Sequence, residues 1–464
     1  MARDMSALED FVLERMGKTK LSGVSMAVVK DGEVVYQRGF GLADRERGIP
    51  ATPETNYCIG SATKSFTCLG IMQLQERGLL SIDDPVEKFL PLEVKPSGET
   101  IRIRHFMSHT SGIPALAYLE NLLRYHHGAI DYSVPVANLD DMLAFVNGAA
   151  DWAVTKPGER WFYLNEGFIM LGGIIEKVSG QKYAEYIREH ILLPLGMARS
   201  FHDYDLAKGD KAMATPYALG KDGRHIAREY PWGQAQADGG LISNALDMAK
   251  YVTMYLNKGR GPSGPIVSLE SIAAMSTPVI RTPGEDIATG RPAAFYGLGL
   301  NISDFFGHKM VGHGGAMYVA TAGMRFLPEF GAGAVALVNG SGYAPLNMVD
   351  FALALLIGQD PWALDALRTE KLLEGLTGYY ETYKGTHRAE VRCDGDYLVV
   401  ENKHNYGSVS STLVPFDLDS GHPRFYVYGS GHRQVVEFFC EGDRVQLLHE
   451  RYLYRKTGKL QSRG

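Results

Sequence analysis

The chain has 464 residues, of which 45% are hydrophobic and 22% are charged, and its formal net charge is −6. At roughly 100–200 residues per domain, this length corresponds to about two to four folding units that can each form a hydrophobic core, and it excludes fibrous, collagen-like and wholly disordered proteins. The chain has 47 Lys and Arg residues and 53 Asp and Glu residues. Because acidic residues outnumber basic ones, no basic stripe is expected and nucleic acid is not a predicted partner.

The N-terminal segment and the cysteines bear on where the protein works. Residues 1–20 include acidic residues where a signal peptide would carry a basic region followed by an apolar run. No apolar stretch approaches the roughly 18–20 residues of a membrane-spanning helix. The 4 cysteines form no CxxC pair, so no zinc knuckle or dithiol motif is predicted and reduced cysteines are expected. We therefore expect a cytoplasmic protein with no membrane partner, no metal and no cofactor.

The first predicted elements are a hairpin and a buried helix. Residues 24–41 indicate two strands around an Asp31-Gly32 turn, because Asp-Gly provides the positive φ that a tight hairpin needs. Residues 61–77 have little polar face, which predicts a helix buried on most sides that ends at Gly78.

From about residue 83 to 260 the pattern is mainly helical, and strands return after it. Candidate helices span residues 140–146, 165–178, 183–190 and 246–256. Candidate strands span residues 296–301, 309–311, 321–326 and 333–338, followed by a helix at 346–357. An early hairpin whose sheet is completed by late strands indicates one α/β unit with an inserted helical region.

The last part of the chain has a different hydrophobic pattern, typical of short strands. A polar connection at residues 358–373 leads to short alternating runs, about eight to twelve residues apart, that begin near Tyr379. Some eight antiparallel strands in so short a segment fit a small closed barrel better than an open sheet with exposed edges. We predict a first domain at 1–365, with its helical insertion at 83–260, and a C-terminal barrel at 366–464.

The first candidate for chemistry is Ser61-Ala62-Thr63-Lys64, at the start of the predicted buried helix. Residues three apart share a helix face, so the Lys64 amine can lie beside the Ser61 hydroxyl, and the helix N-terminus favours developing negative charge. A serine nucleophile with a lysine partner requires this arrangement. The same spacing recurs at residues 179–182, where neither position nor helix dipole helps, so we interpret that copy as chance.

The second candidate is the pair Tyr163 and Asn165, between a predicted turn at 156–159 and the apolar helix that follows. A phenol there can act as a general base if nearby cations lower its pKa from about 10, and an amide beside it can hold a substrate carbonyl. The structural alternative is a core tyrosine followed by a helix-capping asparagine. Taken alone, this pair favours the structural alternative.

The third candidate is Gly312-His313-Gly314-Gly315. Glycines let a substrate approach backbone N–H groups closely, and one such group together with the N–H of Ser61 can form an oxyanion hole. His313 would then orient the base or pass protons. A glycine-rich turn with an incidental histidine accounts for these residues equally well.

Taken in order, the motifs Ser61-x-x-Lys64, Tyr163-x-Asn165 and His313-x-Gly315 resemble the active-site motifs of the penicillin-recognising serine hydrolases. The nearest group is the class C β-lactamase-like set, also called CubicO or S12 peptidases. Flanking segments resemble the same group, and together they cover roughly residues 20–345; they are HFMSHTSGIP at 105–114, PGE at 157–159, PLGM at 194–197 and GGL at 239–241. The resemblance implies a β-lactamase/transpeptidase-like α/β (α+β) fold, in which an antiparallel sheet carries a helical insertion.

The resemblance, rather than the spacing, also implies a mechanism. Ser61 attacks a carbonyl carbon while Lys64 and Tyr163 share the role of proton acceptor and donor. The backbone N–H groups of Ser61 and Ala316 hold the oxyanion, and Asn165 positions the acyl amide. An acyl-enzyme forms, and water or an amine resolves it.

The chain departs from the commonest form of these motifs in two places. Leu164 replaces a residue that is often small or polar, and His313 stands where many β-lactamases have a lysine. The second change removes a permanent cation that would help to bind a substrate carboxylate, so a peptidase or esterase is favoured. Asn165, Gly315 and Ala316 are the expected substrate-binding residues.

The predicted C-terminal barrel resembles the lipocalin-type domain of some peptidases in this group, including archaeal cage-forming ones whose relatives act on peptides with D-amino acids. The resemblance implies a homo-oligomer in which the barrels control access to the site. The expected substrate is a short peptide, amide or ester, and D-amino-acid selectivity is one expectation.

Other functions have less support in the sequence. A metal site at His105 and His109 has neither an HExxH motif nor a carboxylate at ligand spacing, so we expect His109 to form hydrogen bonds within its loop. The chain contains no Gly-x-Ser-x-Gly motif, which an α/β-hydrolase would need. A carboxylesterase or β-lactamase of the same fold and, from another class, a non-catalytic ligand-binding or sensor protein are the alternatives. Activity is expected to fall in acid as Tyr163, Lys64 or His313 takes up a proton.

Overall fold

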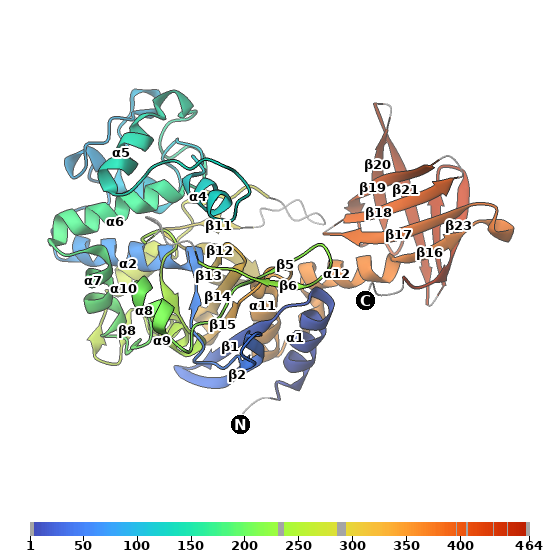
Figure 1. Cartoon of the computed structure of the whole chain (residues 1–464), viewed down its shortest axis with the longest axis horizontal. Coiled ribbons are helices and arrows are strands. Elements are labelled where there is room, and N and C mark those ends of the chain that lie inside the picture. Colours follow the sequence, from blue (N-terminus) through green and yellow to red (C-terminus); the bar gives the residue numbers. More distant parts are fainter. Residues whose placement is uncertain are drawn as a thin grey trace. The chain divides into compact units, whose positions relative to one another are not determined.

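The computed structural model of the chain describes residues 4–230, 236–284, 294–395, 397–404, 407–429, 431–442 and 444–460. The chain divides into two compact units, a larger one that ends at Gln359 and a smaller one that holds the chain from Asp360 onward. The larger unit contains a nine-stranded sheet with its helices, and the smaller one contains a closed barrel (Figure 1).

The sheet of the larger unit is antiparallel and joins the two ends of that unit. β1 (Gly23–Lys30) lies between β2 (Glu33–Asp44) and β15 (Ala332–Val338), with Val24 opposite Val338. The order continues from β15 through β14 (Ala320–Leu327), β13 (His308–Met317), β12 (Asn301–Phe305), β11 (Phe295–Tyr296) and β10 (Ile280–Arg281), and β3 (Ile49–Pro50) forms the other edge. The predicted completion of an N-terminal hairpin by late strands is therefore confirmed.

Helices cover both faces of this sheet, so its central strands are apolar on both sides. Gly333 of β15 lies against α9 (Ala245–Leu256), whereas Gly323 of β14 lies against α11 (Pro345–Ile357). Gly323 is paired with Ala336, whose side chain points away from the face that position 333 occupies. The two helices therefore lie on opposite faces, and both strands are buried throughout their central residues.

A helical region packs beside the sheet and carries the first two sequence motifs. α2 (Thr63–Glu76) is buried from its first residue to Leu74, as predicted, and α6 (Asn165–Ser179) packs across it. The other helices are α1 (Ser6–Thr19), α3 (Ile103–Met107), α4 (Tyr118–His126), α5 (Leu139–Asn147), α7 (Tyr183–Ile187), α8 (Tyr204–Gly209) and α10 (Leu269–Met275). Within the described ranges, no helix is long and apolar enough to cross a bilayer.

Two local predictions differ from the structure. Residues 296–301 form a tight turn between β11 and β12 rather than one strand, because Gly299 has a φ of 73° and the Gly297 N–H donates to the Leu300 carbonyl. The mainly helical region also contains small strand pairs: β4 (Tyr57–Cys58) with β7 (Ile242–Ser243), β5 (Tyr217–Leu219) with β6 (His225–Ala227), and β8 (Arg260–Gly261) with β9 (Gly264–Pro265).

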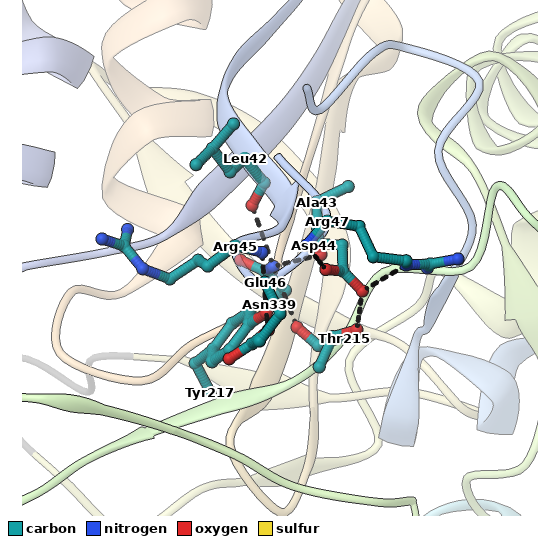
Figure 2. Close-up of polar contacts among 9 residues, drawn as sticks. All are labelled: Leu42, Ala43, Asp44, Arg45, Glu46, Arg47, Thr215, Tyr217 and Asn339. Atoms are coloured by element: carbon teal, nitrogen blue, oxygen red, sulfur yellow. Dashed lines mark hydrogen bonds and ion pairs between the residues drawn. The ribbon is translucent and has the colours of Figure 1, made fainter. Parts of the chain in front are cut away.

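A polar cluster ties one of these additions to the end of the sheet. Figure 2 shows the buried Asn339, just beyond β15, whose Nδ2 donates to the carbonyls of Leu42, Ala43 and Thr215. The Thr215 hydroxyl in turn donates to the Asp44 carboxylate, 2.8 Å away. Buried amides need such partners, so the cluster fixes the segment that leads into β5. Further contacts of the cluster are Gly23 N to Asn339 Oδ1, Arg47 to Asp44, Arg45 N to Tyr217 and Tyr217 to Glu46.

The smaller unit is a closed eight-stranded antiparallel barrel, as predicted. Its strands are β16 (Gly378–Glu381), β17 (Arg388–Asp394), β18 (Tyr397–His404), β19 (Gly407–Asp417), β20 (Arg424–Gly429), β21 (His432–Glu441), β22 (Arg444–His449) and β23 (Tyr452–Gly458). Large buried side chains, among them Tyr380, Phe425 and Phe438, occupy its core, and α12 (Asp365–Leu376) adds Leu373 and Leu376. The barrel interior is therefore packed with its own side chains.

Candidate active site

The site is built around the first turn of α2. A short turn at Gly60–Ala62 runs directly into the helix, and it places the Ser61 hydroxyl 3.1 Å from Nζ of Lys64. Lys64 is completely buried, while Ser61 is partly exposed. The predicted proximity of these two side chains is present in the structure.

Three oxygens surround the amine of Lys64. Nζ lies 2.8 Å from Oδ1 of Asn165 and 2.7 Å from the carbonyl oxygen of Asp238, in addition to its contact with Ser61. The amide and carbonyl oxygens only accept hydrogen bonds, so they take two N–H groups of the amine. The remaining site on Nζ of Lys64 is directed at Ser61 Oγ. That site is an N–H group when the amine is charged and a lone pair when it is neutral.

Tyr163 and Asn165 reach the site from the start of α6. Asn165 is the first residue of that helix and Leu164 is its N-cap, so the amide of Asn165 binds Lys64 instead of capping the helix. Nζ of Lys64 lies 4.9 Å from the centre of the Tyr163 ring. The structure thus brings together the four residues of the first two motifs.

His109 holds the loop that carries Tyr163. Its carbonyl accepts from Phe162 N at 2.7 Å, its Nδ1 accepts from Leu164 N at 3.0 Å, and its ring centre lies 4.1 Å from that of Tyr163. Because Nδ1 is an acceptor, the ring proton is on Nε2. Burial, together with the charge of Lys64, lowers the pKa of His109 well below its ordinary value, so the ring is neutral.

His313 lies in β13, so the third motif is part of a strand rather than the turn that was considered. Nε2 of His313 lies 2.9 Å from the hydroxyl of Tyr296, and Nδ1 contacts the Gly314 carbonyl. Burial lowers the pKa of His313 to about 4, against a smaller opposite effect of the Gly314 carbonyl. The ring is therefore neutral near pH 7, with Nδ1–H donating to the carbonyl and Nε2 accepting from Tyr296.

The glycines of this strand permit a close backbone contact. A Cβ on Gly315 would lie 1.9 Å from the carbonyl oxygen of Ile59, and one on Gly60 would lie 2.5 Å from the backbone nitrogen of Ala316. Only residues without a side chain fit at these two positions. The backbone of Ala316 therefore lies directly beside the turn that contains Ser61.

A cavity of about 580 Å³ opens next to Ser61. Its walls include Ser61, Tyr163, His313, Tyr343, Pro345 and Leu346. Among the described residues no charged side chain lines it, and no group of three His, Cys, Asp or Glu side chains suits a metal ion. The cavity thus offers the Ser61 hydroxyl and uncharged walls to a substrate.

Comparison with known proteins agrees with this fold and site. Residues 8–359 match the sequence profile of the family described as Beta-lactamase, and residues 361–455 match the profile described as Pab87 octamerisation domain. The first match covers most of the chain, so the protein belongs to the Beta-lactamase family, a family of serine hydrolases. The predicted family resemblance is confirmed.

Individual relatives show how far the likeness extends. The octameric penicillin-binding protein homologue from Pyrococcus abyssi is 42% identical, with a TM-score of 0.91 over 98% of this chain and 100% of that one. Putative penicillin-binding protein PbpX of Bacillus subtilis is 31% identical over 55% of this chain and 59% of its own length. Protein flp of Staphylococcus aureus is 33% identical over 42% of this chain and 38% of its own length. This chain therefore matches less than two thirds of either curated relative.

Sequence reasoning did not identify two residues of the site environment, Asp238 and Tyr296, nor the role of His109 in holding the loop that carries Tyr163. Asp238 directly precedes the Gly239-Gly240-Leu241 segment that the motif comparison used. Its place next to that segment was a usable signal. Tyr296 lies in a two-residue strand, and only the pairing of β11 with β12 brings it to the histidine.

Proposed function

We propose that this protein is a serine hydrolase that works through an acyl-enzyme on short peptides or amides. The observation that carries the proposal is the partly exposed Ser61 hydroxyl, 3.1 Å from the buried Lys64 amine and open to an uncharged cavity. Membership of a serine hydrolase family supports it. The roles that follow are part of the proposal.

Ser61 Oγ attacks the substrate carbonyl carbon and passes its proton to the Lys64–Tyr163 pair. The carbonyl oxygen becomes an oxyanion, which the N–H groups of Ser61 and Ala316 stabilise. The tetrahedral intermediate collapses when the proton is delivered to the leaving nitrogen or oxygen, and the acyl group stays on Ser61. Water then attacks the ester in the same way and releases the acid. Asn165 holds Lys64 and the acyl amide, and His313 orients its surroundings as a neutral hydrogen-bonding group.

The cavity walls indicate the class of substrate. A substrate carboxylate would find no cation among the described lining residues, because His313 is neutral near pH 7. This favours an aminopeptidase, an amidase or an esterase over an enzyme that recognises a free carboxylate, as a β-lactamase or carboxypeptidase does. A preference for D-amino-acid substrates rests on the resemblance to the CubicO group.

Carboxylesterase activity is the second candidate, because Pro345 and Leu346 give the cavity an apolar wall that suits an ester with an uncharged acyl chain. A non-catalytic lipid carrier is disfavoured by the packed core of the barrel. We also propose that residues 1–365 and 366–464 are separate functional domains, that the protein forms a homo-oligomer through its octamerisation-type domain, and that it works in the cytoplasm.

A panel assay tests the substrate class. Matched L- and D-aminoacyl amides, short p-nitrophenyl esters and a chromogenic β-lactam are compared on wild-type protein and on Ser61→Ala. We expect turnover of amides and esters that the variant lacks. Strong turnover of L-peptides alone would exclude the D-selective assignment, and equal turnover by the variant would exclude the serine mechanism.

A further inference from the structure

The segment that follows the small strand pair β5–β6 contains a buried aspartate, Asp238, whose backbone contacts Lys64. Residues 237–241 run along the first turns of α2, where Thr67 Oγ1 donates to the Ala237 carbonyl and Leu241 N donates to Thr63 Oγ1. Between these contacts the Asp238 carbonyl accepts from Lys64 Nζ at 2.7 Å. Three positions on one side of α2 thus fix this segment next to the site.

The Asp238 side chain is in an unusual position for an acid. The residue is completely buried, and neither carboxylate oxygen has a hydrogen-bond partner among the described residues. Burial raises the pKa of Asp238 to about 6, while the charge of Lys64 acts in the opposite direction. At neutral pH the carboxyl is therefore ionised, although an ionised group in the interior is costly unless another charge compensates it.

Lys64 is the cation that compensates it. Its ammonium is also completely buried, and a charge in a low-dielectric interior acts strongly on its neighbours. The other titratable groups that interact with the Asp238 carboxyl are acids, phenols or a thiol, so they cannot supply a positive charge; they are Glu120 on α4, Glu166 on α6, Cys58 on β4, Tyr183 on α7 and Tyr204 on α8. The pair Asp238 and Lys64 is therefore neutral overall when both are ionised.

We propose that Asp238 is a positioning residue of the site: its carbonyl fixes the Lys64 amine and its carboxylate is the counter-charge that the lysine needs. The proposal rests on the proposed function and adds a third member to the pair of Ser61 and Lys64. The third group holds the lysine in place and stabilises its positive charge, as the third member of other nucleophile–base sets does. Asp238 itself does not touch the substrate.

A double-mutant cycle tests the charge pair without any substrate. Lys64→Met leaves the carboxylate uncompensated, so we expect the melting temperature at pH 8 to fall, and Asp238→Asn added to it should recover most of the loss. A double variant that folds where Lys64→Met alone does not would be equally strong support. Additive effects, or a double variant less stable than Lys64→Met, would overturn the proposal.

The pH profile supplies the readout that a purely structural role would not move. Removing a negative charge from the site favours the deprotonated form of the group that accepts the Ser61 proton. The acid limb of kcat/KM should therefore move to lower pH by about one unit in Asp238→Asn. Asp350→Asn, a change at a partly buried carboxylate that pairs with Arg325, is the control and should leave the limb in place.

These experiments distinguish a failure of the counter-charge proposal from a failure of the proposed function. If Ser61→Ala is inactive and Asp238→Asn keeps the wild-type limb, only the counter-charge proposal fails. If Ser61→Ala is fully active, the serine mechanism fails, while the stability cycle still decides whether the two charges are coupled.

Discussion

His313 forms two hydrogen bonds that a neutral imidazole satisfies, so its ring is uncharged near pH 7. Nδ1 faces the Gly314 carbonyl and Nε2 faces Tyr296, and burial lowers the pKa of His313 to about 4. Of the three residues expected to take up a proton in acid, this one titrates too low to explain a loss of activity above about pH 5. His313 is therefore not the group whose protonation causes the expected loss of activity in acid.

A substitution at His313 tests this assignment. His313→Asn should lower kcat/KM by about tenfold, the size of one lost neutral hydrogen bond, with the midpoint of the acid limb unchanged. The measurement is kcat/KM from pH 5 to 9 for both proteins. Disappearance of the limb in His313→Asn would show instead that the histidine is the titrating group.

The raised pKa of Asp238 leads us to predict that the free energy of unfolding depends on pH. Its pKa rises from 3.8 to about 6 on folding, so the folded state binds the proton more tightly than the unfolded state does. Wild-type stability is therefore lost as the pH rises from about 4 to 6, by roughly 3 kcal/mol in total, because one pKa unit corresponds to about 1.4 kcal/mol. Asp238→Asn lacks this contribution.

We therefore expect the melting temperature of Asp238→Asn, relative to wild type, to increase as the pH goes from 4 to 7. Thermal unfolding of the two proteins in parallel buffers measures this. A difference that stays constant over the whole range would contradict the assigned burial of an ionised Asp238.

At the level of elements, the contact between β13 and the turn before α2 shapes the site. Gly315 faces the Ile59 carbonyl so closely that a Cβ would lie 1.9 Å from it. Gly315→Ala must push the strand away from Ser61, and displacements of about 1 Å at a reacting centre cost roughly 100-fold in rate. We expect at least that loss in kcat/KM, measured on the best substrate of the panel.

Gly17→Ala is the matched control. Gly17 lies in α1, and a Cβ there would meet no atom of the described residues within 4 Å. The change should therefore keep activity and raise stability slightly, as alanine does in a helix. Full activity of Gly315→Ala, or an equal loss of activity in Gly17→Ala, would refute the role of the close contact.

Much of this element-level picture follows from the sequence. Three features can be seen within short stretches of the sequence. They are the spacing of Ser61 and Lys64, the buried face of α2, and the alternation of apolar and polar residues in the barrel strands. The contacts made by Asp238, Tyr296 and His313 join segments that are far apart in the sequence, through strand pairing or tertiary packing. No local period encodes such contacts, so the sequence could suggest His313 but neither its partner nor its neutral state.

At the scale of the whole molecule, the barrel carries an exposed face, rich in aromatic side chains, that we propose contacts a second copy of the chain. On β20 and β21 the register pairs Tyr426 with Val435 and Tyr428 with Arg433. Tyr428 is 65% exposed and Val435 is 50% exposed, and the Tyr426 ring stacks on Phe416 at 3.8 Å. Exposed aromatic and apolar side chains gathered on one face are typical of an interface.

Charges on this face should weaken assembly. Tyr428→Lys combined with Val435→Lys is expected to reduce the molar mass measured by light scattering, because it adds two positive charges next to Arg433, and a charge in an apolar contact is costly. Tyr383→Lys, at a tyrosine that is 81% exposed elsewhere in the same unit, is the control. An unchanged mass in the double variant, or an equal loss in the control, would place the interface elsewhere.

Ser61 is proposed to form a covalent acyl-type intermediate, and labelling with a fluorophosphonate tests this central step most directly. Intact-mass analysis of wild-type protein should show a single adduct, peptide mapping should locate it on Ser61, and Ser61→Ala should remain unlabelled. An adduct on another residue, or equal labelling of Ser61→Ala, would contradict the serine mechanism.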